Sequence, residues 1–140
     1  MASTHKIREI KGLDEATRGK LEEAGVLTVE QLLEETNTPQ RKGALGKKIG
    51  VAGPQLTELI NRADLMRLKG VGTEMANLLE ECGVDSCKEL QHRTPANLQA
   101  KLKQTNDEKK ITHHAPTLAQ VEAWVKEAAE LVKQQQAAAQ

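Results

Sequence analysis

The segment Leu65–Val84, LMRLKGVGTEMANLLEECGV, decides the fold. It holds a Gly-Val-Gly turn between two segments whose apolar residues recur at helical spacing. A turn of this kind can simply join two packed helices, or it can present the free N–H groups of a helix start to an anion. The function inferred for the chain depends on which of these two roles the turn has.

The same pattern appears earlier in the chain, 58 residues toward the N-terminus. Ile7–Thr36 reads IREIKGLDEATRGKLEEAGVLTVEQLLEET, and Leu65–Thr94 reads LMRLKGVGTEMANLLEECGVDSCKELQHRT. The matched pairs are Gly12 with Gly70, Leu21 with Leu79, Gly25 with Gly83, Val26 with Val84, and Leu32 with Leu90. Internal similarity at a fixed offset predicts two copies of one structural unit.

Each copy is expected to be a series of helices. An apolar pair three residues apart ends a first helix, and a second helix starts near Asp14 or Thr73 and ends at a glycine in the left-handed conformation. A third helix opens with a capping box, and a fourth opens with Thr-Pro, an N-cap followed by proline. The boxes are Thr28 with Gln31 and Ser86 with Glu89, and the Thr-Pro pairs are Thr38-Pro39 and Thr94-Pro95. The last helices begin near Pro54 and Pro116. Because no segment alternates like a strand, we predict an all-α fold.

The two copies are expected to pack into one continuous helical domain. The helix from about Pro54 to Arg67 closes the first copy and leads into the second hairpin, and no Gly- or Ser-rich linker separates the copies. We expect a first repeat over residues 5–64, a second repeat over residues 65–132, and a flexible tail over residues 133–140.

The charges of the chain are balanced. Its 140 residues include 20 Lys and Arg and 20 Asp and Glu, so the formal net charge is zero. This balance weakens the case for tight, charge-driven binding of nucleic acid. Apolar residues make up 38% of the chain and Trp124 is its only aromatic residue, so we expect an aliphatic core.

The sequence indicates a soluble, cytoplasmic protein without a membrane partner. Its start, MASTHKIREI, contains no apolar segment of signal-peptide length. No apolar run approaches the roughly 18 residues that a membrane span requires. Two cysteines in a chain of this size do not make a disulfide framework.

The segment LMRLKGVGTEMANLL resembles the helix-hairpin-helix motif, in which Gly-apolar-Gly follows an apolar pair. The residues that fill the motif are Leu65, Leu68, Gly70, Val71, Gly72, Ala76 and Leu79. Over residues 5–132 the chain also resembles a bacterial family, domain of unknown function 4332, with stretches such as TPQRKGALGKKIG, NRADLMRLKGVG and NDEKKITHHAPTLAQVEAWV. The resemblance implies two tandem helix-hairpin-helix-like repeats, and it implies no activity.

In helix-hairpin-helix proteins that bind DNA, backbone N–H groups of the turn meet a phosphate oxygen at the start of the second helix. The resemblance therefore implies a sequence-independent DNA contact at Lys69, Gly70, Val71, Gly72 and Thr73. The first hairpin departs from the motif. Asp14 stands where Gly72 stands and Arg18 stands where Ala76 stands, and a carboxylate there would cap the helix itself and repel a phosphate. The alternative is that both turns only join helices.

A basic cluster offers a secondary phosphate patch. Arg41, Lys42, Lys47 and Lys48 form it, although such a cluster can also be an ordinary solvated surface. The segment that follows loosely resembles a helix-turn-helix, whose second helix would present Gln55, Thr57, Asn61 and Arg62 to a DNA groove. Gly53-Pro54 in the turn argues against this alternative.

No catalytic, metal or cofactor site is expected. Cys82, Cys87 and His92 are five residues apart, but the first copy has Ala24 and Val29 in place of the two cysteines, so these are packing positions. The chain has no nucleophile elbow, no Walker-type loop and no metalloprotease motif. We therefore expect a protein without enzymatic activity and without a small-molecule substrate.

Two hypotheses remain open. In the first, the second hairpin makes weak, sequence-independent contacts with a DNA backbone. In the second, the chain is a protein-interaction adaptor that uses an exposed apolar helix face or associates with itself. The Gly-Val-Gly turn favours the first hypothesis, and the zero net charge favours the second.

Overall fold

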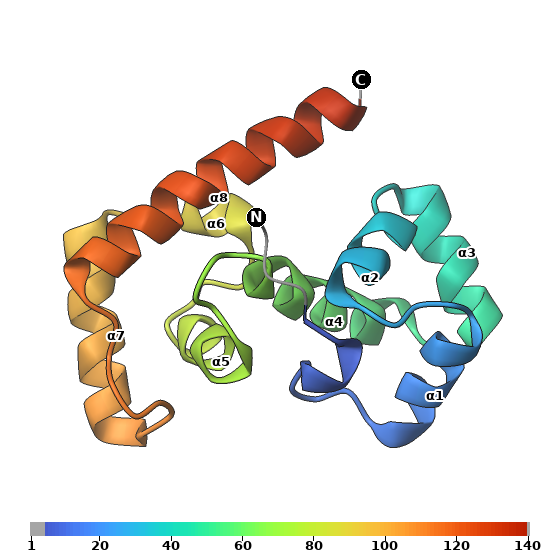
Figure 1. The fold of residues 1–140 in the computed structure, drawn as a ribbon, viewed down its shortest axis with the longest axis horizontal. Coiled ribbons are helices and arrows are strands. Elements are labelled where there is room, and N and C mark those ends of the chain that lie inside the picture. The colour runs from blue at the N-terminus through green and yellow to red at the C-terminus, as the bar shows by residue number, and fades with distance from the viewer. Residues whose placement is uncertain (1–4, 140) are drawn as a thin grey trace.

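The fold is known from a computed structural model, which describes the backbone of residues 5–139 and the side chains of residues 5–134. Every regular element in this part of the chain is helical, so the all-α prediction is confirmed (Figure 1). The elements are the 3-10 helix η1 (Ile7–Glu9) and the α-helices α1 (Glu15–Glu23), α2 (Val29–Glu35), α3 (Pro39–Ile49), α4 (Gly53–Met66), α5 (Thr73–Glu81), α6 (Cys87–Leu90), α7 (Pro95–Lys109) and α8 (Leu118–Ala139).

Local capping residues fix most of the helix starts. At α1, Asp14 Oδ1 accepts a hydrogen bond from the N–H of Thr17 at 3.1 Å. At α2, Thr28 and Gln31 bond each other's backbone N–H groups at 3.2 and 3.1 Å, which completes the predicted capping box. These bonds satisfy N–H groups that have no partner inside the helix.

Three predicted helix starts differ in detail. Ser86 accepts from the N–H of Glu89, but the carboxylate of Glu89 bonds Arg93 rather than completing a box. The side chain of Thr94 makes no capping bond within the described residues, although α7 does begin at Pro95. The first helix of copy one is only the short 3-10 helix η1, because the spacing of Ile7 and Ile10 also suits a 3-10 turn.

The two halves of the chain share a backbone geometry. The turn glycines Gly12 and Gly70 have φ values of +90° and +85°, and Gly25 and Gly83, which follow α1 and α5, have values of +87° and +86°. Glycine adopts this left-handed conformation without the strain that a Cβ causes. The helices also pack in the same order, α2 on α4 and α3 on α4 in the first half, and α6 on α8 and α7 on α8 in the second.

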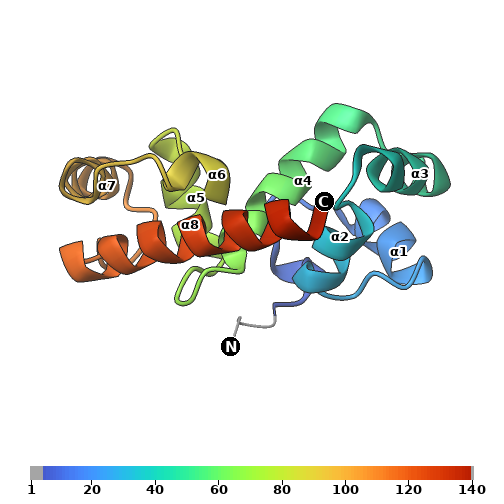
Figure 2. The same cartoon turned by 90° about the horizontal axis from the view of Figure 1, so that it is seen from above.

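A single hydrophobic cluster contains side chains of both halves. The duplicated positions that are buried in both halves are Ile7 with Leu65, Ile10 with Leu68, Leu21 with Leu79, Val26 with Val84, Val29 with Cys87, and Leu32 with Leu90. Figure 2 shows α8 running from α7 toward α2. Leu131 of α8 and Leu33 of α2 line a common cleft. The side chains of residues 135–140, in the predicted flexible tail, lie outside the described residues.

Asn106 fixes the connection between α7 and α8. Its buried Oδ1 accepts hydrogen bonds from the N–H groups of Ile111 and Thr112 at 3.0 and 2.8 Å, and its Nδ2 donates to the carbonyl of Thr112 at 3.1 Å. Buried polar groups are stable only when they are paired in this way. Asn106 therefore sets the direction in which the chain enters α8.

Candidate functional site

The five residues of the predicted DNA contact form the turn between α4 and α5. Lys69 and Gly70 are exposed, Gly72 and Thr73 are half-buried, and Val71 is only 1% exposed because its side chain packs into the core. The N–H of Val71 closes the turn by donating to the carbonyl of Leu68 at 3.1 Å. The turn is thus both a packed corner and a partly exposed segment of backbone.

The two glycines of the turn have different roles. Gly70 has a φ of +85° and needs the conformational freedom of glycine. Gly72 has extended angles, with φ of −99° and ψ of −162°, and no heavy atom lies within 4 Å of where a Cβ would stand. Glycine at position 72 is therefore not required by the backbone. Because residue 72 is a glycine, the N-cap of α5 has no side chain.

The start of α5 differs from the start of α1 in its capping. In α1, the carboxylate of Asp14 accepts the N–H of the third helical residue, Thr17. Hydrogen bonding to the side chain of Thr17, and then to its N–H, lowers the pKa of Asp14 below its usual value. In α5, no side chain of the described residues makes a capping bond. The N–H of Met75 thus lacks the side-chain acceptor that the equivalent N–H of Thr17 has in α1, and the first N–H groups of α5 carry the partial positive charge of a helix start.

Helix α8 and η1 hold the turn on both sides. The indole Nε1–H of Trp124 donates to the carbonyl of Lys69 at 2.9 Å, and the N–H of Lys69 donates to Glu127 Oε1 at 3.0 Å. The hydroxyl of Thr73 donates to the carbonyl of Glu9 in η1. Sequence reasoning missed all three contacts, although the spacing of Trp124 and Glu127 places them on one face of α8.

The charge around the turn is mixed. The cationic side chain of Lys69 is exposed, but the neighbouring Arg67 lies 2.5 Å from a carboxylate oxygen of Asp64. Glu127 places a carboxylate against the turn, and Glu74 lies in the first turn of α5. An anion would therefore be held mainly by N–H groups rather than by a positive field.

A protein-family model described as domain of unknown function, DUF4332, matches residues 11–131. The chain belongs to the DUF4332 family. The match spans both halves of the fold and includes the turn between α4 and α5. No curated protein and no solved structure matches the chain.

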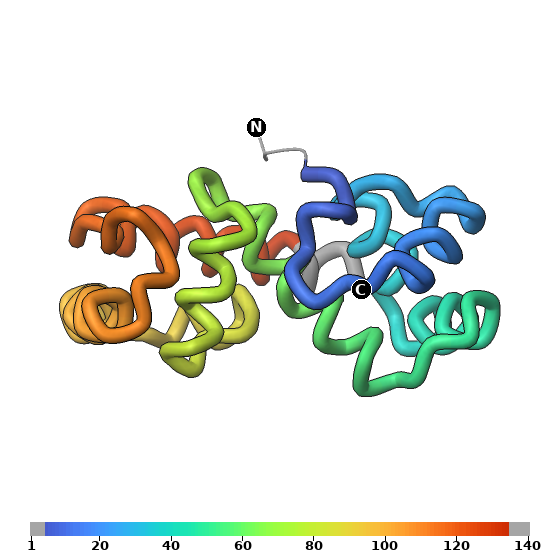
Figure 3. Tube along the Cα trace, turned by 90° about the horizontal axis from the view of Figure 1, so that it is seen from below, coloured from blue at the N-terminus to red at the C-terminus, as the bar shows by residue number. Residues whose placement is uncertain are grey.

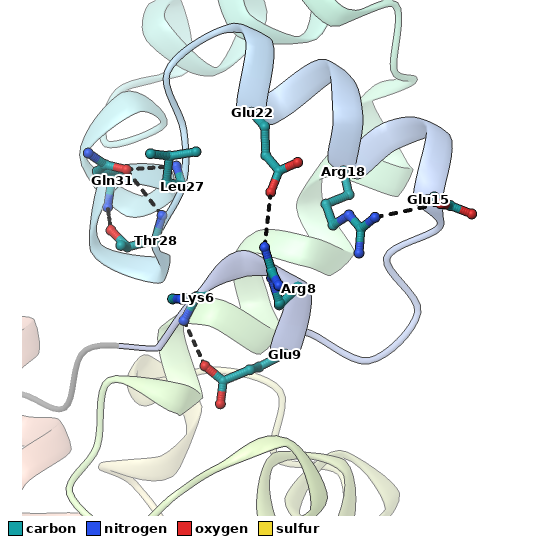
Figure 4. A network of polar contacts seen from close by, with 9 residues as sticks. All are labelled: Lys6, Arg8, Glu9, Glu15, Arg18, Glu22, Leu27, Thr28 and Gln31. Carbon is teal, nitrogen blue, oxygen red and sulfur yellow. Dashed lines mark hydrogen bonds and ion pairs between the residues drawn. The ribbon is translucent and has the colours of Figure 1, made fainter.

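Charged side chains pair with one another and with the backbone around the first hairpin of the DUF4332 domain (Figure 4). Glu9 Oε2 accepts the N–H of Lys6 at 2.7 Å, and this hydrogen bond is the main cause of the lowered pKa of Glu9. Arg8 lies 3.9 Å from Glu22, and Arg18 lies 3.7 Å from Glu15. Asp14 caps α1, as the sequence predicted, whereas the equivalent helix of the second hairpin, α5, has no side-chain cap.

The predicted secondary basic patch lies on α3, at the far end of the first half and away from the turn (Figure 3). Arg41 donates to the carbonyl of Glu34 at 3.0 Å, and Lys42 donates to the hydroxyl of Thr57. Lys47 and Lys48 are exposed in the last turn of α3. The structure does not bring this patch and the turn together.

The helix-turn-helix alternative is not supported by the side chains of α4. Arg62 Nε lies 2.8 Å from Glu80 Oε2 in α5, and both side chains are largely covered. Thr57 accepts the hydrogen bond from Lys42. Two of the four residues that would read a DNA groove are thus engaged within the protein.

Both cysteines occupy core positions, as predicted. Cys82 and Cys87 are buried free thiols, and Cys87 Sγ donates to the carbonyl of Asp64 at 3.3 Å. Burial raises the pKa of Cys87 to about 12, and the negative charge of Asp64 adds to the shift. Within the described residues, no three His, Cys, Asp or Glu side chains lie together in a way that could hold a metal ion. No helix there is long and apolar enough to cross a membrane.

Proposed function

We propose that this DUF4332 domain is a non-enzymatic binding module whose two halves are helix-hairpin-helix-like units. Its second hairpin makes weak, sequence-independent contacts with a DNA backbone. The supporting observation is the start of α5, where Gly72 provides no cap, compared with α1, which Asp14 caps. The two free, buried thiols suit a cytoplasmic, reducing location.

The proposed contact needs only backbone chemistry. A phosphate oxygen would accept hydrogen bonds from N–H groups at the start of α5, where the helix dipole favours negative charge. Lys69, next to these groups and exposed, would add one ionic contact. Because N–H groups and a lysine at the phosphates do not reach base edges, the contact would not depend on DNA sequence.

The turn already binds one anionic oxygen. Glu127 Oε1 accepts the N–H of Lys69, which indicates that this backbone segment suits an oxyanion. The same carboxylate repels an incoming phosphate, as does Glu74 in the first turn of α5. We therefore expect weak binding rather than tight binding.

The first experiment is a fluorescence polarisation titration of a labelled DNA duplex with the full chain. We expect binding at low salt that weakens about 10- to 40-fold between roughly 50 and 200 mM salt, the loss for two to three phosphate contacts. Two duplexes of equal length and different sequence should bind equally well. Absence of binding at the lowest salt would contradict the proposal.

Removing the charge of Glu127 is expected to strengthen DNA binding. Glu127→Gln keeps an oxygen that can accept the N–H of Lys69 but removes the carboxylate charge beside the turn. We expect affinity at low salt to rise about 3- to 10-fold, the effect of one nearby charge. The matched control is Glu122→Gln, which removes an exposed charge from the same helix. Equal gains in the two variants would mean that the turn is not the contact.

A further inference from the structure

A groove of about 690 Å³ lies between α3 and the start of α4. Four glycines, Gly43, Gly46, Gly50 and Gly53, line it together with Val51 and Leu56. Gly46 packs closely against the backbone that follows α3, because a Cβ at position 46 would lie 3.3 Å from the carbonyl oxygen of Val51. The groove is therefore mainly apolar, and its walls lack the side chains that would fill it.

The groove lies against an unbalanced set of cations. Helix α3 has four cationic residues and no acidic residue, and two of them, Lys42 and Lys47, line the groove. Lys20 approaches from α1, with its Nζ 3.9 Å from the position of a Cβ at Gly50. Among the residues with described side chains, none of the α3 cations lies within ion-pair distance of a carboxylate. In a chain of zero net charge, this local excess suits an acidic partner.

We propose that this groove binds an acidic segment of a partner protein that also carries apolar side chains. Apolar side chains of the segment occupy the groove against the half-buried Val51, above the buried Leu56, and the bare glycines allow its backbone to approach closely. Carboxylates of the segment pair with the exposed Lys47 and with Lys42, whose ammonium group has further N–H donors besides the one that bonds Thr57. A nucleic-acid backbone offers the negative charge but no aliphatic side chain for the apolar walls, so the lining favours a peptide.

The start of α4 adds to the charge complementarity. Its N-cap, Ala52, makes no side-chain capping bond, and Gly53 and Pro54 are the first helical residues. A carboxylate of the bound segment near this helix start gains from the helix dipole. The groove is lined by residues at the start of α4, whereas the turn to α5 follows the end of this 14-residue helix. Both sites can therefore be occupied in one molecule.

The probe is a fluorescein-labelled peptide with Leu at helical spacing and Glu elsewhere, titrated with the full chain. One control peptide has Ser in place of Leu, and another has Lys in place of Glu. We expect saturable binding of the Glu/Leu peptide at micromolar concentrations and at least about tenfold weaker binding of both controls. Failure of the Glu/Leu peptide to bind, or equal binding of the Ser peptide, would overturn the proposal.

Two variants test whether the Glu/Leu peptide binds in the groove. Gly43→Leu fills the groove, and Lys47→Glu reverses one of the charges that line it. Each is expected to weaken binding of the Glu/Leu peptide at least tenfold. The matched controls are Gly19→Leu, at a helical glycine that likewise has no heavy atom near its Cβ position, and Lys126→Glu, at an exposed lysine of α8. Both controls should bind like the parent chain.

Two other possible occupants of the groove, nucleic acid and a second copy of the chain, would give different results. If Gly43→Leu abolishes DNA binding and leaves peptide binding unchanged, the groove holds nucleic acid and the proposal is wrong. If sedimentation shows a dimer of the parent that Gly43→Leu dissociates, a second copy of the chain is the occupant, which also overturns it. Thermal unfolding by circular dichroism verifies folding of each variant. Lys47 is exposed, so Lys47→Glu is expected to fold even if Gly43→Leu does not.

Discussion

Replacing Trp124 by alanine is expected to lower the free energy of unfolding by about 3–5 kcal/mol. The indole is only 3% exposed, belongs to the core cluster and packs near Gly70 in the turn between α4 and α5. Alanine leaves a cavity there and removes the hydrogen bond to the carbonyl of Lys69. Because domains of this size are stable by only about 5–15 kcal/mol, the loss is large. Urea unfolding followed by circular dichroism measures it.

Trp124→Phe separates the two contributions. Phenylalanine keeps most of the apolar contact and loses only the bond from Nε1 to Lys69, so we expect a cost of about 1–2 kcal/mol. A cost for Trp124→Ala no larger than that for Trp124→Phe would show that the side chain is not packed as described.

The thiols of the folded protein are expected to resist a disulfide reagent such as dithionitrobenzoate. With a pKa of about 12, Cys87 at pH 8 has about 10³-fold less reactive thiolate than an unfolded cysteine, whose pKa is near 9. Cys82 is equally buried. We therefore expect no prompt reaction of the native chain and the reaction of two thiols after addition of denaturant. Prompt reaction of either native thiol would contradict its place in the core.

The raised pKa of Cys87 also predicts how stability changes at alkaline pH. The folded state keeps the thiol neutral, whereas the unfolded thiol ionises as the pH passes about 9. Ionisation therefore favours unfolding, and the free energy of unfolding falls by on the order of 1 kcal/mol per pH unit between about pH 9 and pH 12. The variant Cys87→Val, which has the side chain of the first half, should lose this dependence.

The parts of the fold that the sequence predicts are those set by neighbouring residues. Asp14 and the pair Thr28 and Gln31 cap helices through side chains that reach N–H groups three residues away, so a short segment carries all the information. The left-handed glycines Gly25 and Gly83 follow from the same local rule. The internal duplication also marks core positions, because apolar pairs such as Leu21 with Leu79 and Val26 with Val84 are buried in both halves.

The environment of the turn could not be read from the sequence. Trp124 and Glu127 reach Lys69 from more than 50 positions away, and Thr73 reaches Glu9 across the two halves. Contacts of this kind depend on how the helices pack, and they produce no sequence pattern at a fixed spacing. The neutralisation of Arg67 by Asp64 is different, since a pair three residues apart on one helix is visible in the sequence.

The most direct test of the proposed phosphate contact is DNA titration of Gly72→Asp at low salt. An aspartate fits the extended backbone and the open space at position 72, and it would cap the N–H groups of α5 as Asp14 caps those of α1. We expect unfolding free energy to stay equal or rise by about 0.5–1 kcal/mol, while DNA binding is lost. The companion variant Asp14→Gly should lose stability and keep DNA binding. DNA binding by Gly72→Asp as tight as that of the parent chain would contradict the account.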